Sequence, residues 1–121
     1  MINIIAIRGA TTVAENTEYE IEKESIRLFQ EILKQNKIQG SDVKSLIISC
    51  TNDITKAYPG KFIREHFSLP NLAIMHFNEM CVENSLNLCI RFLIFMDGIK
   101  SSTKFVYLNN ASALRKDLLT D

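Results

Sequence analysis

The feature that most constrains the fold of this chain is a helical repeat of apolar residues that begins after Thr17. Thr17 and Glu20 have the spacing of a capping box, in which the threonine caps the helix and the glutamate reaches back to it. Charged residues fill the opposite face, and Gly40 is a natural stop. We therefore predict an amphipathic helix of about five turns. Its inner face is formed by Ile21, Ser25, Leu28, Phe29, Ile32 and Leu33.

Three short apolar runs lie on either side of this helix, at residues 2–7, 43–50 and 72–77. Short apolar runs bounded by turn residues are typical of buried strands. The first run is bounded by Gly9. Before the third run, Pro59 suits the first turn of a short amphipathic helix. These patterns predict the order strand, helix, strand, helix, strand for the first part of the chain.

Residues 86–96 form a further apolar run, which periodicity alone does not assign to helix or strand. The dipeptide Asp97-Gly98 favours a strand, because it is a strong hairpin-turn signal and residues 105–108 follow as a return strand. We therefore expect a hairpin here. The whole chain is predicted to be an α+β protein, in which one long and one short helix cover a mixed β-sheet in the order β-α-β-α-β-β-β.

Composition places the chain among ordinary soluble proteins. Its 121 residues fit one domain, 1–121, with 46% hydrophobic and 23% charged residues. The net charge of zero argues against a broad nucleic-acid surface. The N-terminal run has no basic segment before it and is interrupted at Arg8, so we expect neither a signal peptide nor a membrane span. The three cysteines lack the spacing of a zinc or redox site, and their odd number without a secretory signal favours free thiols in a reducing, cytoplasmic location. They are Cys50, Cys81 and Cys89.

Three charged residues in apolar surroundings are the first candidates for a functional site. Arg8 closes the first predicted strand, where it either faces a cleft or is a solvated strand end. Arg91 lies in the most apolar stretch of the chain, and a buried guanidinium needs a carboxylate or an anionic ligand. Glu79 lies between apolar residues; it either pairs with Arg91, accepts a hydrogen bond from a ligand hydroxyl or is a plain loop carboxylate.

Weaker candidates lie elsewhere. Lys61 and Arg64 share one face of the short helix, although such a pair is usually solvated surface. Arg115 near the C-terminus has the same ambiguity, and Tyr58 and Tyr107 suit either the core or a site. The sequence contains no nucleophile elbow, no glycine-rich phosphate loop and no histidine pair with ligand spacing. The inventory favours recognition of a small anion, or a reaction that needs only shape and charge.

Taken together, these residues resemble the AroH-type chorismate mutases over nearly the whole chain. The strongest element is Ile-Arg-Gly-Ala-Thr-Thr-Val at residues 7–13. The other motifs follow in family order and at nearly family spacing, which makes the set specific although each motif alone is weak. They are Asn16-Thr17, Tyr58-Pro59-Gly60-Lys61, Arg64-Glu65, Asn78-Glu79-Met80, Cys89-Ile90-Arg91, Val106-Tyr107-Leu108, Leu114-Arg115 and Asp117.

The resemblance implies a function and an assembly. Enzymes of this family rearrange chorismate to prephenate, in phenylalanine and tyrosine biosynthesis, without a cofactor, a metal or a covalent intermediate. The family forms homotrimers of α/β-type subunits, a fold similar to that of the RidA-like deaminases, with active sites at the subunit interfaces. We expect this chain to take chorismate as its substrate and to assemble with further copies of itself. We expect it to bind neither a membrane nor a nucleic acid.

Matching positions assign roles to individual residues. Arg91, Glu79 and Arg8 correspond to the catalytic residues: Arg91 would stabilise the ether oxygen, Arg8 would bind a carboxylate and Glu79 would accept the ring hydroxyl. The remaining substrate-binding positions are Tyr58, Lys61, Arg64, Ile74, Met75, His76, Tyr107, Leu114 and Arg115. Several positions depart from the family pattern, namely Met75 for threonine, His76 for cysteine, Cys81 for aspartate and Asn84-Ser85 for smaller residues.

Other readings of the same residues are possible. The departures at Met75, His76 and Cys81 would suit a catalytically impaired homologue that binds a small carboxylate ligand. A RidA-like deaminase shares the trimeric fold and has an arginine near an interface cleft, but the run at 7–13 and the Glu79/Arg91 pair argue against it. A purely structural trimer module would leave the apolar setting of Arg91 unexplained.

Overall fold

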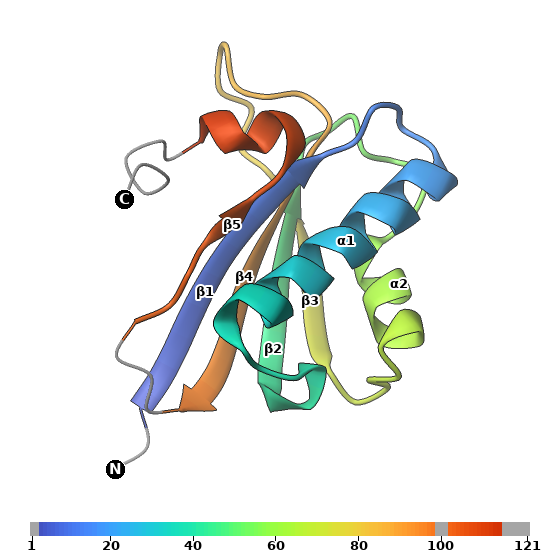
Figure 1. Ribbon diagram of the computed structural model, residues 1–121. Helices are drawn as coiled ribbons and strands as arrows, with labels where there is room; N and C mark the ends of the chain where they lie inside the picture. Colours follow the sequence, from blue (N-terminus) through green and yellow to red (C-terminus); the bar gives the residue numbers. More distant parts are fainter. Residues whose placement is uncertain (1–2, 99–101, 115–121) are drawn as a thin grey trace.

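The computed structural model describes residues 3–98 and 102–114, and within them the chain forms a five-stranded sheet with two α-helices packed against one face (Figure 1). The predicted order of strands and helices is confirmed. The elements are β1 (Asn3–Thr12), α1 (Glu18–Asn36), β2 (Val43–Cys50), α2 (Pro59–His66), β3 (Ala73–Asn78), β4 (Cys89–Gly98) and β5 (Val106–Tyr107), with short 3₁₀ helices η1 (Gly40–Asp42) and η2 (Asn109–Ala113).

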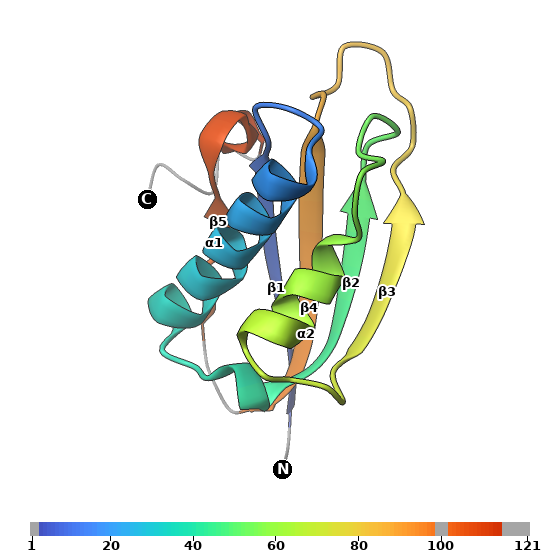
Figure 2. The same cartoon turned by 90° about the vertical axis from the view of Figure 1, so that its right-hand side faces the viewer.

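The sheet is mixed, as predicted, and its spatial order is β3-β2-β4-β1-β5. Strand β4 runs antiparallel to both β1 and β2, whereas β3 is parallel to β2 and β5 is parallel to β1. Both helices lie on the same side of the sheet (Figure 2). We call this side the covered face and the opposite side the open face.

The predicted hairpin between β4 and β5 is wrong. Gly98 is the last residue of β4 and pairs with Asn3, and β5 pairs instead with β1, where Tyr107 lies opposite Ala10. The reason is that β1 and β2 already occupy both edges of β4 over most of its length. A strand arriving later can pair only at a free edge, and β1 has one.

Strand β1 is longer than the predicted run at residues 2–7, so Arg8 lies within a strand and not at its end. Gly9 does not stop the strand. It lies beneath α1, where an added Cβ would come within 2.7 Å of Ile32 Cδ1 and 3.1 Å of the carbonyl oxygen of Val106. The glycine allows the helix to approach the sheet closely.

Helix α1 begins at the predicted cap, where the Glu20 backbone N–H donates to Thr17 Oγ1 at 3.2 Å. The reciprocal half of the capping box is absent at this cap. The Glu20 carboxylate instead pairs with Lys23 at 3.0 Å, and the Thr17 backbone N–H donates to the carbonyl of Glu15. The helix ends before Gly40, because Lys37 adopts the left-handed conformation that closes its last turn.

The core lies between the helices and the covered face. Its largest members are fully buried and come from every layer: Ile7, Ile21, Leu28, Phe29, Ile32, Leu46, Ile48, Ile63, Ile90 and Ile94. On the open face, large apolar side chains remain exposed, and Phe77 is 49% exposed. Among the described residues, no helix is long and apolar enough to cross a membrane.

Candidate active site

Five side-chain positions form a row across the open face. Register places Ala10 opposite both Tyr107 and Arg91, and Arg91 opposite Ser49, which in turn lies opposite Phe77. Residues paired across neighbouring strands point to the same face of a sheet. Arg91 therefore projects from the central strand onto the open face, away from the helices, with Tyr107 on one side and Ser49 on the other.

Glu79 lies just beyond the end of β3 and contacts this row. Its backbone N–H donates to the carbonyl of Cys50 at 2.8 Å, which places its side chain over the end of β2. Ser49 Oγ donates to Glu79 Oε1 at 2.6 Å, and Arg91 Nε lies 2.6 Å from Glu79 Oε2. The Arg91–Glu79 contact is an ion pair without the alignment of a hydrogen bond.

The sequence left three readings of Glu79 open, and the structure shows the pairing with Arg91. Both side chains are partly buried, since 16% of the Glu79 side chain and 34% of the Arg91 side chain is exposed. They line one hollow on the open face. Ser49 is not among the residues predicted for the site, although a polar residue at an alternate position of an apolar strand is a signal for it.

Two further predicted residues lie near Arg91. Arg8 is exposed, two positions from Ala10 on β1 and hence on the same face. Its guanidinium carbon lies 5.9 Å from the centre of the Phe105 ring. The Tyr107 hydroxyl oxygen is buried and has no hydrogen-bond partner among the described residues. The open face thus carries Arg8, Arg91, Tyr107 and Glu79, which we call the arginine cluster.

A second group of predicted residues lies where the start of α2 meets the edge strand β3. Here Tyr58 and His76 line a pocket of about 460 Å³. His76 Nε2 accepts a hydrogen bond from the Gly60 backbone N–H at 3.0 Å, and the Tyr58 ring packs edge-on at 5.1 Å. Gly60 is confined by His76 and Ile74, since an added Cβ would come within 2.8 Å of His76 and 2.7 Å of Ile74.

Burial lowers the pKa of His76, and the nearby Arg64 guanidinium lowers it further. The ring is therefore neutral near pH 7, as its acceptor role requires. Lys61 and Arg64 are exposed on the same helix. We call Tyr58, Lys61, Arg64, Ile74 and His76 the α2 cluster.

Met75 alternates with Ile74 and His76 on β3, so it faces the open side and belongs to neither cluster. Leu114 ends the described part of the chain after η2, and Arg115 lies outside the described residues. One chain thus holds the predicted site residues as two clusters on different sides of the sheet. The pocket of the α2 cluster and the hollow of the arginine cluster adjoin at Asn78, which lines both.

The two buried cysteines near these hollows are poor nucleophiles. Burial raises the pKa of Cys50 to about 12 and that of Cys89 to about 11. A thiol must lose its proton to attack, and these two keep it near neutral pH. The chemistry that the arginine cluster offers is electrostatic: fixed positive charge, a carboxylate and a phenol, held on rigid strands.

Comparison with known proteins finds relatives over nearly the whole chain. The family model described as "Chorismate mutase type I" matches residues 4–118. Chorismate mutase AroH of Bacillus subtilis (strain 168) is 33% identical over 117 residues, which are 95% of this chain and 92% of that protein. Chorismate mutase AroH of Thermus thermophilus is 32% identical over 115 residues, 93% of each chain.

Among solved structures, a chorismate mutase from Clostridium thermocellum superposes with a TM-score of 0.86 at 37% identity, and the match covers 91% of this chain and 99% of that one. The shared fold, the near-complete coverage and the family model lead to one conclusion: the chain belongs to the type I chorismate mutase family.

Proposed function

We propose that this protein rearranges chorismate to prephenate and that Arg91 stabilises the transition state. The observation that carries the proposal is the setting of Arg91, a guanidinium on the central strand that is paired with Glu79 and shares a row of the open face with Tyr107. Family membership makes the chain an isomerase that acts on chorismate. The geometry supports the roles that we propose below for individual residues.

The reaction is an intramolecular Claisen rearrangement. The ether C–O bond breaks while a C–C bond forms within the same molecule, so no proton transfer, nucleophile or redox step is needed. An enzyme accelerates it by holding the substrate in its compact reactive conformer. It also stabilises the negative charge that develops on the ether oxygen, through donors that are already in place.

Arg91 suits this second task because its direction is fixed before the substrate binds. Glu79 contacts Nε of the guanidinium through Oε2, and Ser49 donates a hydrogen bond to the other carboxylate oxygen of Glu79, Oε1. A preorganised charge of this kind acts on the transition state more than on the ground state. Glu79 also offers an acceptor for the ring hydroxyl of the substrate.

Arg8 and Tyr107 suit the binding of a substrate carboxylate. The planar guanidinium of an arginine matches a carboxylate in two parallel hydrogen bonds, which a lysine does not reproduce. The buried hydroxyl of Tyr107, without a partner among the described residues, supports a role in binding a polar group. Lys61 and Arg64 of the α2 cluster would attract and seat the dianion.

We further propose that the site is completed by a second copy of the chain, in a homotrimer. Two observations support this assembly. The two clusters lie on different sides of the sheet in one chain, so a neighbouring subunit is needed for both to face one substrate. The open face also carries exposed or half-buried apolar side chains from several strands, which the helices do not cover: Ile4, Ile47, Met75, Phe77, Leu93 and Phe95.

The test is to follow the loss of chorismate absorbance and the formation of prephenate with the purified protein and with the variants Arg91→Ala and Arg91→Lys. We expect rapid turnover by the unmodified protein and a loss on the order of 10²-fold or more in kcat for both variants. Lys34→Ala, which removes an exposed cation from the last turn of α1, serves as the control and should leave kcat unchanged.

The alternatives have different outcomes. Turnover that survives in Arg91→Ala would refute the electrostatic role while leaving the mutase activity in place. Binding of chorismate without turnover by the unmodified protein would instead identify a repurposed binding protein. In that case His76, which replaces the usual cysteine, would be the first position to revert.

A further inference from the structure

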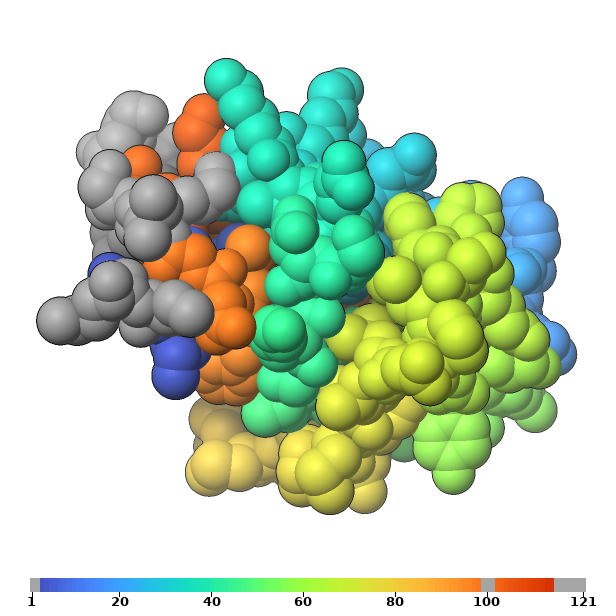
Figure 3. Space-filling view, turned by 90° about the horizontal axis from the view of Figure 1, so that it is seen from below, coloured from blue at the N-terminus to red at the C-terminus, as the bar shows by residue number. Residues whose placement is uncertain are grey.

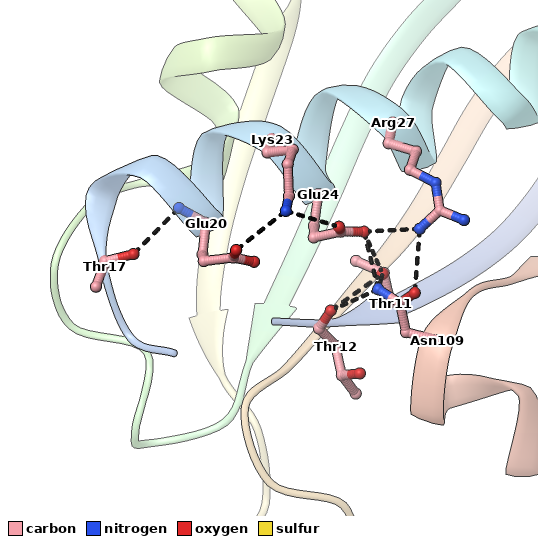
Figure 4. Close-up of polar contacts among 8 residues, drawn as sticks. All are labelled: Thr11, Thr12, Thr17, Glu20, Lys23, Glu24, Arg27 and Asn109. Carbon is pink, nitrogen blue, oxygen red and sulfur yellow. Dashed lines mark hydrogen bonds and ion pairs between the residues drawn. The ribbon is translucent and has the colours of Figure 1, made fainter. Parts of the chain in front are cut away.

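A buried carboxylate lies on the inner side of α1, outside both clusters. Glu24 is only 7% exposed and is surrounded by polar groups from three elements (Figure 4). Its Oε1 accepts hydrogen bonds from Asn109 Nδ2 at 2.8 Å and from the Arg27 guanidinium at 3.0 Å, and Thr11 Oγ1 lies 3.5 Å away. A buried carboxylate is tolerated only when it is paired and hydrogen-bonded in this way.

Asn109 is the centre of this network. Its amide group donates to the carbonyl of Thr12 at 2.9 Å and to Thr11 Oγ1 at 3.1 Å, and its Oδ1 accepts from Arg27 at 3.1 Å. Its backbone has φ 54, a left-handed conformation that asparagine tolerates better than most residues. The side chain therefore joins the first residue of η2 to both β1 and α1 (Figure 4).

The network lies two residues beyond Tyr107. Strand β5 is only Val106–Tyr107 and pairs with β1 over those two positions, so the strand ladder alone holds it weakly. Just after it, Leu108 donates its backbone N–H to Ala10 and Asn110 donates its own to Thr12 Oγ1. The polar groups around Asn109 thus supply much of the attachment of this short strand to the sheet.

We propose that Glu24, Arg27 and Asn109 are positioning residues that hold Tyr107 in the row beside Arg91. The inference rests on the proposed function, because placing Tyr107 matters for activity only if Tyr107 contacts the substrate. None of the three reaches the open face, so they act through the placement of β5 and η2. A satisfied buried polar network specifies one arrangement of the segments it joins.

The first test reads the position of Tyr107 without using activity. The chain has three tyrosines, so protein labelled with 3-fluorotyrosine should give one fluorine NMR signal per ring, assigned with Tyr→Phe variants. Asn109→Gly removes the amide while keeping a residue that accepts φ 54. We expect the Tyr107 signal to shift or broaden, and those of Tyr19 and Tyr58 to stay. Thr17→Ala, which weakens the same helix at its cap, should leave the Tyr107 signal in place.

The second test is a double-mutant cycle on kcat/KM. We expect Asn109→Gly to lower kcat/KM by about tenfold in the unmodified protein, through misplacement of one site group. In a Tyr107→Phe background the same change should cost less than about twofold, because the two effects share one cause. Glu24→Gln, which retains an acceptor for Asn109, should lose less activity than Glu24→Ala.

Two results would overturn the proposal: an unmoved Tyr107 signal in Asn109→Gly, or an equal loss of kcat/KM in both backgrounds. The fluorine measurement also separates this proposal from the proposed function. A protein that does not turn over chorismate, but whose Tyr107 signal moves in Asn109→Gly, would refute the assigned reaction while confirming that the network places Tyr107.

Discussion

The two faces of the sheet differ, although the same strands supply both. On the covered face, Ile7, Ile48 and Ile94 are closed off by the helices and lose all contact with water. On the open face, the positions that alternate with them carry Arg8, Arg91 and a set of exposed apolar side chains. The hydrophobic core is thus built on one side of the strands, and the candidate site residues Arg8 and Arg91 lie on the other. The comparison teaches that one chain completes its core on the covered face and leaves its candidate site residues on the open face without a cover.

The strongest test of this comparison removes one phenylalanine from the core on the covered side of the sheet and one from the open face. Phe29 is fully buried against Phe67, with ring centres 4.9 Å apart, so Phe29→Ala should lower the free energy of unfolding by about 3–5 kcal/mol. Phe77→Ala on the open face should lower it by less than about 1 kcal/mol in the separated chain. Urea unfolding at a fixed protein concentration measures both. Equal losses would mean that the open face is part of the folding core.

A charge placed on the open face should separate the subunits of the proposed trimer without unfolding them. Leu93 lies at the centre of this face, opposite Arg8 and Ile47. In Leu93→Glu, burying the carboxylate between subunits would cost several kcal/mol, whereas leaving it in water costs little. We expect a monomer by sedimentation with unchanged circular dichroism and no mutase activity. A trimer that persists in this variant would contradict the proposed interface.

The α2 cluster should respond to pH through His76. Because its pKa is lowered, the neutral ring is the form that stabilises the fold, so its contribution is present above about pH 6.5 and is lost as pH falls through the folded-state pKa. Protonation would also remove the acceptor for Gly60 and add a cation beside Arg64. We expect a loss below about 1 kcal/mol, since solvent reaches part of the ring.

Histidine NMR measures this directly. The chain has two histidines, and His66→Gln assigns the remaining signal to His76. We expect that signal to titrate below about pH 6.5, with Nε2 unprotonated at neutral pH. A His76 that titrates at or above its ordinary value would rule out the hydrogen bond from Gly60 as its main contact.

The last prediction concerns the reactivity of the three thiols, and it has the smallest expected effect on the fold. Cys50 and Cys89 lie buried with raised pKa values, whereas Cys81 is exposed. Iodoacetamide at pH 8 should therefore modify one cysteine per folded chain, and three in denaturant. Mass spectrometry counts the adducts, and Cys81→Ser should abolish labelling of the folded protein. Modification of Cys50 in the folded protein would show that the end of β2 opens to solvent.

Much of the fold was predictable because the information is local. Helix α1 is recognised by its cap and repeat, and the strands by short apolar runs, since side-chain direction is determined within a few residues. Arg91 was found for the same reason: a charge inside an apolar run demands an explanation from the sequence alone. The whole-chain resemblance supplied the family.

What the sequence did not predict depends on contacts between distant segments. The hairpin signal at Asp97-Gly98 was outweighed because β1 and β2 flank β4, which left the edge of β1 as the place for β5. Gly9 was interpreted as the end of a strand, although it is a packing site beneath Ile32. Ser49 and the carboxylate network at Glu24 also escaped notice, since their partners are far away in the chain.

The sequence by itself thus determined the helices and strands, the family and the charged residues proposed for the site. Only the tertiary structure decided which residues share a face, because strand pairing is a choice among edges that no local pattern records. That choice placed Arg91 beside Glu79 and in one row with Tyr107, and it placed His76 on the covered side of the sheet, against Gly60.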